Sequence, residues 1–285
     1  MRFFTSLLVG GLACTGVAQA APDPAAWTAP QVPFHIIGNT YYVGTQELAA
    51  YLIVSSQGDV LIDGTLEQNV PQIEANIRAL GFRLSDVKLI LNTHAHFDHA
   101  AGIAQLKKDT GAKFDASAGD APILERGHIT FGPSAPVHFP PAKVDHVVQD
   151  GETVGVGAVH LTAHLTPGHT PGCTSWTWLV MENGRTYRVI DVCSLTVAGN
   201  PLVNNTEYPG IVADYRASFA KLKAMRADVF LAPHASFYNP QKKLAARRPG
   251  APNPFIDPRA LPAFVTACEA AFNAELAKQQ GAAAK

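Results

Sequence analysis

The chain has 285 residues, of which 47% are hydrophobic, and its formal net charge is −1. That much apolar sequence is enough to bury a sizeable core, so the chain should fold without help. The near-zero charge and the lack of any basic run exclude a nucleic-acid partner.

The first twenty residues have the pattern of a secretory signal. Arg2 precedes an apolar run over residues 3–17, which is too short for a membrane-spanning helix. The small residues Ala18 and Ala20 suit cleavage before Ala21. We therefore expect an exported, periplasmic protein with no membrane association after cleavage.

These boundaries predict a signal peptide over residues 1–20 and a single domain over residues 21–285. Processing as a lipoprotein at Cys14 is a weaker alternative, because Gly11 stands where an aliphatic residue would be expected. No later segment has the length of a membrane-spanning helix.

Hydrophobic periodicity predicts an α/β protein in which strands and helices alternate. Gln57-Gly58-Asp59 and Glu182-Asn183-Gly184 each have the composition of a hairpin turn. The expected strands lie in 34–44, 50–64, 87–93, 146–195 and 229–234, and the expected helices in 65–82, 100–111, 119–127, 214–227 and the C-terminal segment. Two rounds of strands followed by helices indicate two similar halves packed sheet against sheet.

Four potential metal ligands occur within six residues, in His94-Ala95-His96-Phe97-Asp98-His99. The motif lies on a turn between the strand at 87–93 and the next helix. A lone histidine usually packs or bonds a carbonyl, but four such groups in one turn have no packing rationale, because crowded imidazoles repel when protonated. Imidazole and carboxylate ligands suit zinc, and three protein ligands per ion leave a position for water.

Two later histidines stand where a strand ends in a turn: His169 in "LTPGHTPG" and His234 in "FLAPHASF". With the motif at 94–99 they make six protein ligands, enough for two zinc sites of three ligands each. The remaining histidines carry no such context. His160 and His164 are four residues apart, but the segment is strand-like, so they do not share a helical face.

The HxHxDH motif at 94–99, followed by His169 and His234, resembles the metallo-β-lactamase superfamily. Within it, "GTQELAAYLIVSSQGDVLIDG", "LTPGHTPGCTSW" and the Ser194 of "VCSLT" are most similar to the subclass B3 metallo-β-lactamases. The resemblance implies a four-layer αβ/βα sandwich with the metals at one edge of the paired sheets.

The resemblance also implies two Zn²⁺ ions and a hydrolytic reaction. The first zinc would take His94, His96 and His169, and the second would take Asp98, His99 and His234. A metal-bridging hydroxide, oriented by the catalytic Asp98, would attack the amide of a small-molecule β-lactam: a carbapenem, cephalosporin or penicillin. Nothing in the sequence demands more than a monomer.

Two hydroxyl residues, Ser194 and Thr196, match the positions at which the family contacts substrate carboxylates and water. They are equally well explained as ordinary hydroxyls at the end of a strand. The sequence does not choose between these interpretations.

Three cysteines follow the predicted signal: Cys173, Cys193 and Cys268. In other subclasses a cysteine near residue 193 binds the second zinc, which is one possible role for Cys193. Because Cys173 begins one strand of a predicted hairpin and Cys193 ends the other, an oxidising compartment favours a disulfide between them. Cys268, on a predicted helix, would then be a buried free thiol.

Other enzymes share this metal motif, including thioester hydrolases similar to glyoxalase II, lactonases and phosphodiesterases. Export favours the β-lactamase, because glyoxalase II works on a cytosolic metabolite. Ser194 also favours it, because those relatives place a bridging aspartate near the position of Ser194. Asp191 lies three residues away, and this odd spacing should turn it to the opposite face of the sheet. A non-enzymatic zinc-binding protein is disfavoured, since a storage site would be closed by its ligands.

Overall fold

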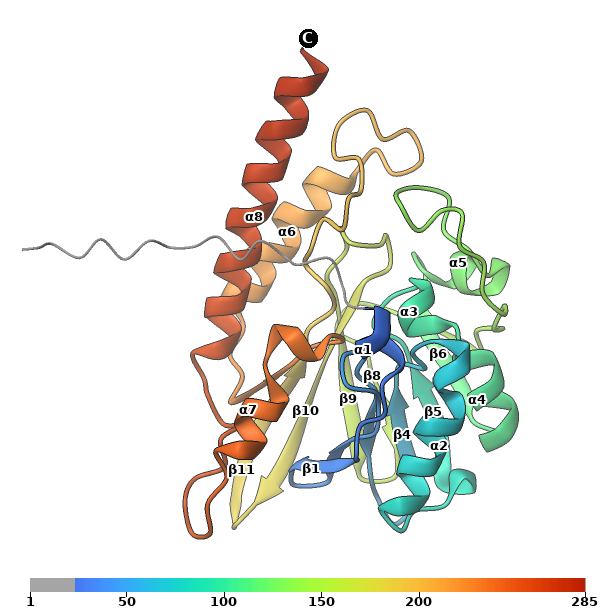
Figure 1. Cartoon of the computed structure of the whole chain (residues 1–285), viewed down its shortest axis with the longest axis vertical. Coiled ribbons are helices and arrows are strands. Elements are labelled where there is room, and N and C mark those ends of the chain that lie inside the picture. Colours follow the sequence, from blue (N-terminus) through green and yellow to red (C-terminus); the bar gives the residue numbers. More distant parts are fainter. Residues whose placement is uncertain (1–23, 285) are drawn as a thin grey trace, which may run out of the picture.

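The computed structural model of the protein describes residues 24–284, so the predicted signal peptide and Cys14 lie outside the described residues. Two mixed sheets form its centre (Figure 1). The first has the order β1 (Phe34–Ile37), β2 (Thr40–Tyr42), β3 (Tyr51–Ile53), β4 (Asp59–Ile62), β5 (Val87–Leu91), β6 (Lys113–Ser117), β7 (His146–Val148). The second has the order β12 (Val229–Leu231), β11 (Arg185–Asp191), β10 (Thr174–Glu182), β9 (Val159–Leu165), β8 (Thr153–Val156).

Helices flank the two sheets, which confirms the predicted α/β sandwich (Figure 1). They are α1 (Pro24–Thr28), α2 (Val70–Ala79), α3 (Phe97–Ala100), α4 (Ile103–Thr110), α5 (Ala121–Arg126), α6 (Ile211–Ala224), α7 (Pro240–Ala245) and α8 (Ala260–Ala283). In Figure 1, α2 and α4 lie on one side of the sheets and α6 and α8 on the other. That residues 21–285 form a single domain stays a prediction.

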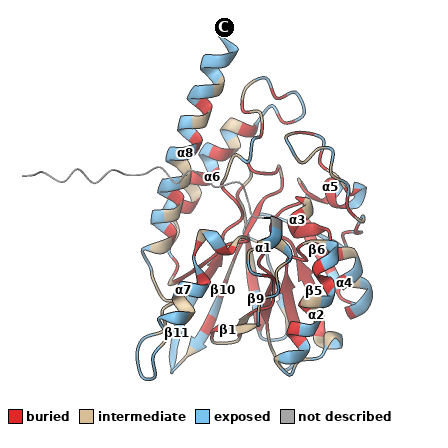
Figure 2. Cartoon of the chain, in the orientation of Figure 1, coloured by how far each residue is buried: buried red, intermediate tan, exposed pale blue. Residues whose placement is uncertain are grey.

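The core lies between the sheets, where buried side chains of both form one hydrophobic cluster (Figure 2). Two tryptophans of β10 also bond across it. The indole N–H of Trp176 donates to the carbonyl of Asn92 at 3.1 Å, and that of Trp178 donates to the hydroxyl of Thr40 at 3.0 Å. Burying these rings with their N–H groups satisfied fixes one sheet against the other.

Local sequence signals place most element ends as expected. The predicted helix at 100–111 becomes α3 and α4, and α4 ends at Gly111, whose φ of 71° only glycine adopts without strain. The β10–β11 hairpin turns at Asn183 and Gly184, both with positive φ, as its composition predicted. His160 and His164 lie on β9, so they share no helical face.

Within residues 24–284, no helix combines the length and apolarity needed to cross a bilayer. The longest helix, α8, runs over 24 residues along the outside of the second sheet and carries Cys268. This cysteine is a free thiol, as predicted, but it is half-buried and not buried, because only one stripe of α8 contacts the core.

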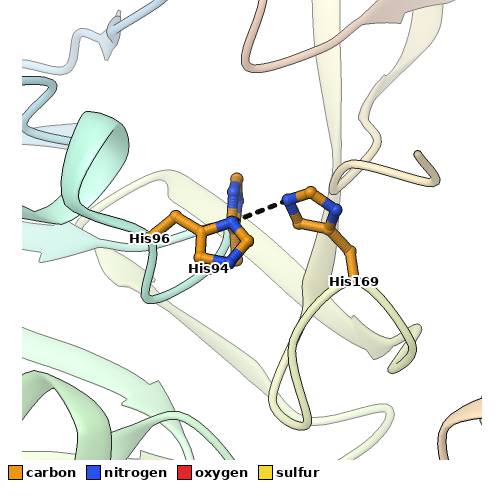
Figure 3. A group of neighbouring side chains, drawn as sticks. All are labelled: His94, His96 and His169. Carbon is orange, nitrogen blue, oxygen red and sulfur yellow. Dashed lines mark hydrogen bonds between the residues drawn. The ribbon is translucent and has the colours of Figure 1, made fainter. Parts of the chain in front are cut away.

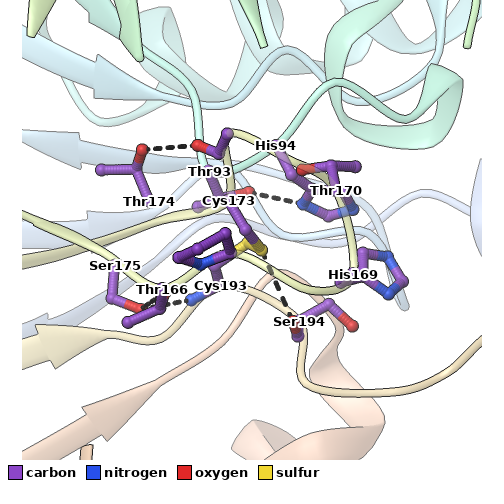
Figure 4. Close-up of a disulfide and its surroundings, with 12 residues drawn as sticks. Thr93, His94, Thr166, His169, Thr170, Cys173, Thr174, Ser175, Cys193 and Ser194 are labelled. Atoms are coloured by element: carbon purple, nitrogen blue, oxygen red, sulfur yellow. Dashed lines mark hydrogen bonds between the residues drawn. A yellow bond between two sulfur atoms is a disulfide. The ribbon is translucent and has the colours of Figure 1, made fainter. Parts of the chain in front are cut away.

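Cys173 and Cys193 form a disulfide with their Cα atoms 5.8 Å apart, confirming the pairing expected from the hairpin (Figure 4). Cys173 directly precedes β10, and Cys193 follows β11 by two residues. The bond therefore ties the loop that carries His169 to the segment that carries Ser194.

We predict that replacing both cysteines by alanine lowers the free energy of unfolding by about 3 kcal/mol, because the closed loop of about twenty residues is then unconstrained in the unfolded chain. Urea unfolding in chelator measures the loss. Cys268→Ala is the matched control. It removes a thiol without opening the disulfide loop, so it should show none of the loss that opening this loop causes. Equal midpoints for the wild type and the double variant would contradict the prediction.

Candidate metal centre

The predicted ligands converge at one edge of the two sheets, although they come from three separate loops. The residues from His94 to His99 follow β5 and enter α3. His169 lies between β9 and β10, and His234 follows β12. Both sheets thus contribute ligands to one centre, and the structure brings together all six residues that the sequence singled out.

The first group comprises His94, His96 and His169, which are all buried. Figure 3 shows the three rings turned toward one another. Nδ1 of His96 lies 2.8 Å from Nε2 of His169, and the ring centre of His94 lies 5.1 Å and 4.7 Å from those of His96 and His169. One ligand atom from each residue lies within 4.8 Å of the others.

The second group comprises Asp98, His99 and His234. Oδ2 of Asp98 lies 3.2 Å from Nε2 of His99 and 3.4 Å from Nε2 of His234. The two imidazole nitrogens are themselves 3.2 Å apart. His94 is near enough to Asp98 and His99 to serve this group too, so the two groups adjoin.

The outward nitrogens of His94 and His169 have fixed partners. Nδ1 of His169 donates to the carbonyl of Thr196 at 2.7 Å. Nδ1 of His94 lies 3.1 Å from the hydroxyl of Thr93, which donates its own proton to Asp63 and so accepts from the ring. In both residues this tautomer leaves the Nε2 lone pair directed at the centre.

The two groups differ in charge. Burial lowers the pKa of His96 to about 4, and burial also holds the pKa values of His94 and His169 well below the usual range. Burial opposes the charged form of Asp98, but the neighbouring His99, followed by His234, outweighs it and holds the pKa of Asp98 well below normal. Burial also opposes the charged form of His234, but its contacts with Asp98 and Glu47 raise its pKa to about 9.

The donor set fits metal ions. Tetrahedral zinc with Zn–N bonds of about 2.0–2.1 Å places its ligand nitrogens about 3.3 Å apart. The separations of 2.8 Å and 3.2 Å between imidazole nitrogens are close to that value. Because His169 donates through Nδ1, its Nε2 faces His96 with a lone pair, an arrangement that a cation between them stabilises.

Asp63 holds the loop that carries the motif. Its Oδ1 accepts from the side chain of Asn92 at 2.8 Å and from the backbone N–H of Thr93 at 2.7 Å, and its Oδ2 accepts from the Thr93 hydroxyl at 2.7 Å. Oδ2 also lies 3.7 Å from Nδ1 of His99. Asp63 follows β4 and has a φ of 64°, a left-handed backbone conformation that is strained for a residue other than glycine. This strain occurs at the residue that holds the motif loop.

Asp120 joins two ligand loops. Its carboxylate accepts from the backbone N–H of Ala95, between His94 and His96, at 2.8 Å. It also accepts from the Thr170 hydroxyl and the Gly172 N–H, each at 2.8 Å, in the loop that carries His169. No functional role for Asp120 could be predicted from the sequence, because its partners lie 25 to 52 residues away in the chain.

Ser194 lies beside His169 of the first group (Figure 4), and Thr196 contacts both of them. The hydroxyl oxygens of Ser194 and Thr196 are 3.1 Å apart, and Ser194 is only 2% exposed. The carbonyl of Thr196 accepts the bond from His169. Thr196 therefore orients a predicted ligand through its backbone, while contact of either hydroxyl with a substrate stays a prediction.

Asp191 lies outside both ligand groups, on β11 opposite Trp176 in the core. It is fully buried, and neither carboxylate oxygen has a hydrogen-bond partner among residues 24–284. Burial, reinforced by the carboxylate of Asp63, raises its pKa well above the usual value. A bridging role between two ions does not fit this position.

Two mixed sheets with a histidine- and aspartate-rich centre at their common edge define an α/β protein built to bind metal. The chain belongs to the metallo-beta-lactamase superfamily, whose sequence model matches residues 48–234.

Solved structures of high similarity are subclass B3 or other metallo-beta-lactamases. The subclass B3 metallo-beta-lactamase of Bradyrhizobium japonicum is 48% identical, with a TM-score of 0.86 over 90% of this chain and 98% of that one. The metallo-beta-lactamase of Legionella gormanii is 42% identical, with a TM-score of 0.85 over 89% of this chain and 98% of that one.

Curated relatives match over shorter stretches. A hydroxyacylglutathione hydrolase of Methylobacterium nodulans is 38% identical over 35% of this chain and 33% of its own length. The mitochondrial persulfide dioxygenase of Homo sapiens is 30% identical over 48% of this chain and 42% of its own length. The chain thus spans less than half of either relative.

We predict that Asp120→Ala lowers the free energy of unfolding by about 3 kcal/mol or more, because three buried donors lose their acceptor. Metal content per chain should fall as well, since the two loops are no longer joined. Chemical denaturation and elemental analysis measure the two effects. The exposed Asp109→Ala serves as control, and an Asp120→Ala variant as stable as this control would refute the role.

We predict that Asp191→Asn gains stability relative to the wild type as pH rises from 5 to 8. The folded pKa of Asp191 exceeds that of the unfolded chain, so its contribution is complete below about pH 4 and is lost at higher pH. Paired urea titrations at several pH values in chelator give the difference, in which other groups cancel. A difference independent of pH would show that Asp191 does not titrate in this way.

Proposed function

We propose that the protein is a zinc-dependent β-lactamase that opens the amide bond of carbapenems, cephalosporins and penicillins. The observation that carries the proposal is the pair of adjoining ligand groups, with ligand atoms 2.8 to 3.4 Å apart. The similarity to the B. japonicum enzyme over 98% of that chain supports this substrate class.

Each group would hold one zinc ion. His94, His96 and His169 would hold the first, and Asp98, His99 and His234 the second. When bound, the ions supply a water nucleophile at neutral pH and polarise the carbonyl under attack. Three protein ligands per ion leave room for water and substrate, which a storage site would not need.

Asp98 is the proposed catalytic carboxylate. Because its pKa is held well below normal, it is ionised at neutral pH. One of its oxygens contacts both histidines of the second group, which leaves the other to orient water by hydrogen bonding. The hydroxyls of Ser194 and Thr196 are the proposed contacts for the substrate carboxylate.

The proposed enzyme is an exported, periplasmic monomer, since residues 1–20 have the pattern of a signal and one chain provides both ligand groups. The disulfide supports an oxidising compartment.

A thioester hydrolase similar to the hydroxyacylglutathione hydrolases is the second candidate, favoured by the identity of 38% to the M. nodulans relative. Against it, the match covers only 33% of that relative. In addition, Ser194 lies beside the ligands, and the nearby Asp191 is buried away from them.

We expect the mature protein to hydrolyse a carbapenem, to lose this activity to a chelator and to regain it with zinc. Asp98→Ala should reduce kcat/KM by about 10²–10⁴-fold, because a positioned proton acceptor is lost. Absorbance assays with a carbapenem and a glutathione thioester, with zinc content per chain, are the measurements.

His160→Ala is the control, since this exposed histidine lies on β9 away from the ligands. Turnover of the thioester alone would replace the β-lactamase by the second candidate. An Asp98→Ala variant that keeps wild-type rates with full zinc occupancy would refute the assigned role of Asp98.

A further inference from the structure

Glu47 reaches the second ligand group from a segment outside the HxHxDH motif. It precedes β3, whereas His234 follows β12, so the two come from different sheets. Leu48 and His234 form an isolated antiparallel bridge. The backbone N–H of Ala235 donates to the carbonyl of Glu47 at 2.8 Å, and that of Ala49 donates to the carbonyl of Pro233 at 2.9 Å. This short ladder places Glu47 beside His234.

The Glu47 carboxylate accepts from three groups on the His234 segment. Its Oε1 lies 3.2 Å from Nδ1 of His234 and 2.5 Å from the Ser236 hydroxyl. Its Oε2 accepts from the backbone N–H of Ser236 at 3.2 Å. The side chains of Glu47 and His234 are only 19% and 16% exposed, so water screens their contact weakly.

The contact fixes the state of the His234 ring. A carboxylate only accepts, so Nδ1 donates to Glu47, and Nε2 is the nitrogen that faces His99 at 3.2 Å and Asp98 at 3.4 Å and would give up its proton to an ion. The rings of Trp27 and Phe237 flank His234, with centres 5.9 Å and 5.2 Å away. They limit ring movement but do not choose a tautomer.

The other ligand histidines are held differently. His94 is bonded by a hydroxyl and His169 by a backbone carbonyl. His99 faces Asp63 at 3.7 Å, beyond hydrogen-bond distance. Among the residues described, His234 is therefore the one ligand histidine whose outward nitrogen bonds a carboxylate.

We propose that Glu47 is a positioning residue for the second half of the metal centre. A carboxylate on the outward N–H makes the inward nitrogen a stronger ligand and holds the ring in place, and loss of such a partner typically costs 10–100-fold in metal affinity. The inference rests on the proposed function only in assigning an ion to the group of Asp98, His99 and His234. It does not depend on the substrate.

Glu47 is not needed for the pairing of the two segments themselves. The backbone bonds of Leu48, Ala49 and Ala235 already make that ladder. Removing the carboxylate should therefore leave the fold intact and act on the ring. Ser236 provides a matched comparison, since its hydroxyl bonds the same oxygen without touching a ligand.

The test is metal titration of the apoprotein against a chromophoric competitor, for the wild type, Glu47→Ala, Glu47→Gln and Ser236→Ala. Glu47→Ala should weaken the second binding event 10–100-fold and leave the first unchanged. Glu47→Gln should lie between, because its amide oxygen still accepts from the ring but carries no charge. Ser236→Ala should stay within about threefold of wild type, since it keeps the contact between Glu47 and the ring.

Cobalt(II) substitution gives a readout that a merely structural role would not move: the visible bands of the second ion should shift in both Glu47 variants and not in Ser236→Ala. Thermal unfolding in chelator checks the folding of each variant. If Glu47→Ala does not fold, Glu47→Gln carries the test.

Several results would overturn the proposal: wild-type affinity and spectrum in the Glu47 variants, equal weakening of both binding events, an equal effect of Ser236→Ala, or a wild-type chain that binds one ion only. Absence of β-lactam turnover alongside the expected loss of affinity would instead refute the proposed substrate while supporting the role of Glu47.

Discussion

The centre depends on holding the ligand atoms of five imidazoles and a carboxylate about 3 Å apart on loops from two different sheets. Neutral imidazoles whose lone pairs face one another repel, and flexible loops would relieve this by moving apart. Two buried carboxylates prevent it. Asp63 binds the start of the motif loop to the end of β4, and Asp120 binds the middle of that loop to the loop carrying His169. Burial raises the pKa of Asp63, and it raises that of Asp120 to about 6. In their ionised form these carboxylates accept hydrogen bonds about twice as strong as neutral ones, which suits them to this task.

The clustering of the six candidate ligands could be predicted from the sequence because its signal is local. Four donors in six residues are improbable in an ordinary turn, and His169 and His234 each stand where a buried strand gives way to a turn. The Cys173–Cys193 disulfide was also within reach, since a hairpin places the start of one strand opposite the end of the next. In each case, periodicity or turn composition was enough.

The supporting carboxylates could not be found in this way. Asp63, Asp120 and Glu47 act on groups 25 to 189 residues away in the chain, and no local pattern encodes such contacts. The parallel β4–β5–β6 arrangement and the division into sheets of seven and five strands were equally hidden, since periodicity predicts strands but not their neighbours. The prediction that Cys268 is buried was wrong for the same reason, because its burial depends on which side of α8 contacts the core.

The contrast between the two ligand groups has a physical consequence. His94, His96 and His169 are buried and neutral, so they can accept an ion without first losing a proton. Asp98 and His234 instead compensate each other's charge when no ion is present, and an ion must displace that pairing. The first group therefore resembles a preformed site, whereas the second exchanges an internal ion pair for a metal. His234 therefore needs an anchor more than the neutral histidines of the first group do. When an ion displaces its pairing with Asp98, an unanchored His234 ring could swing away with its proton. A carboxylate on the far side of the ring, at Glu47, opposes that movement and remains in place whichever partner occupies Nε2.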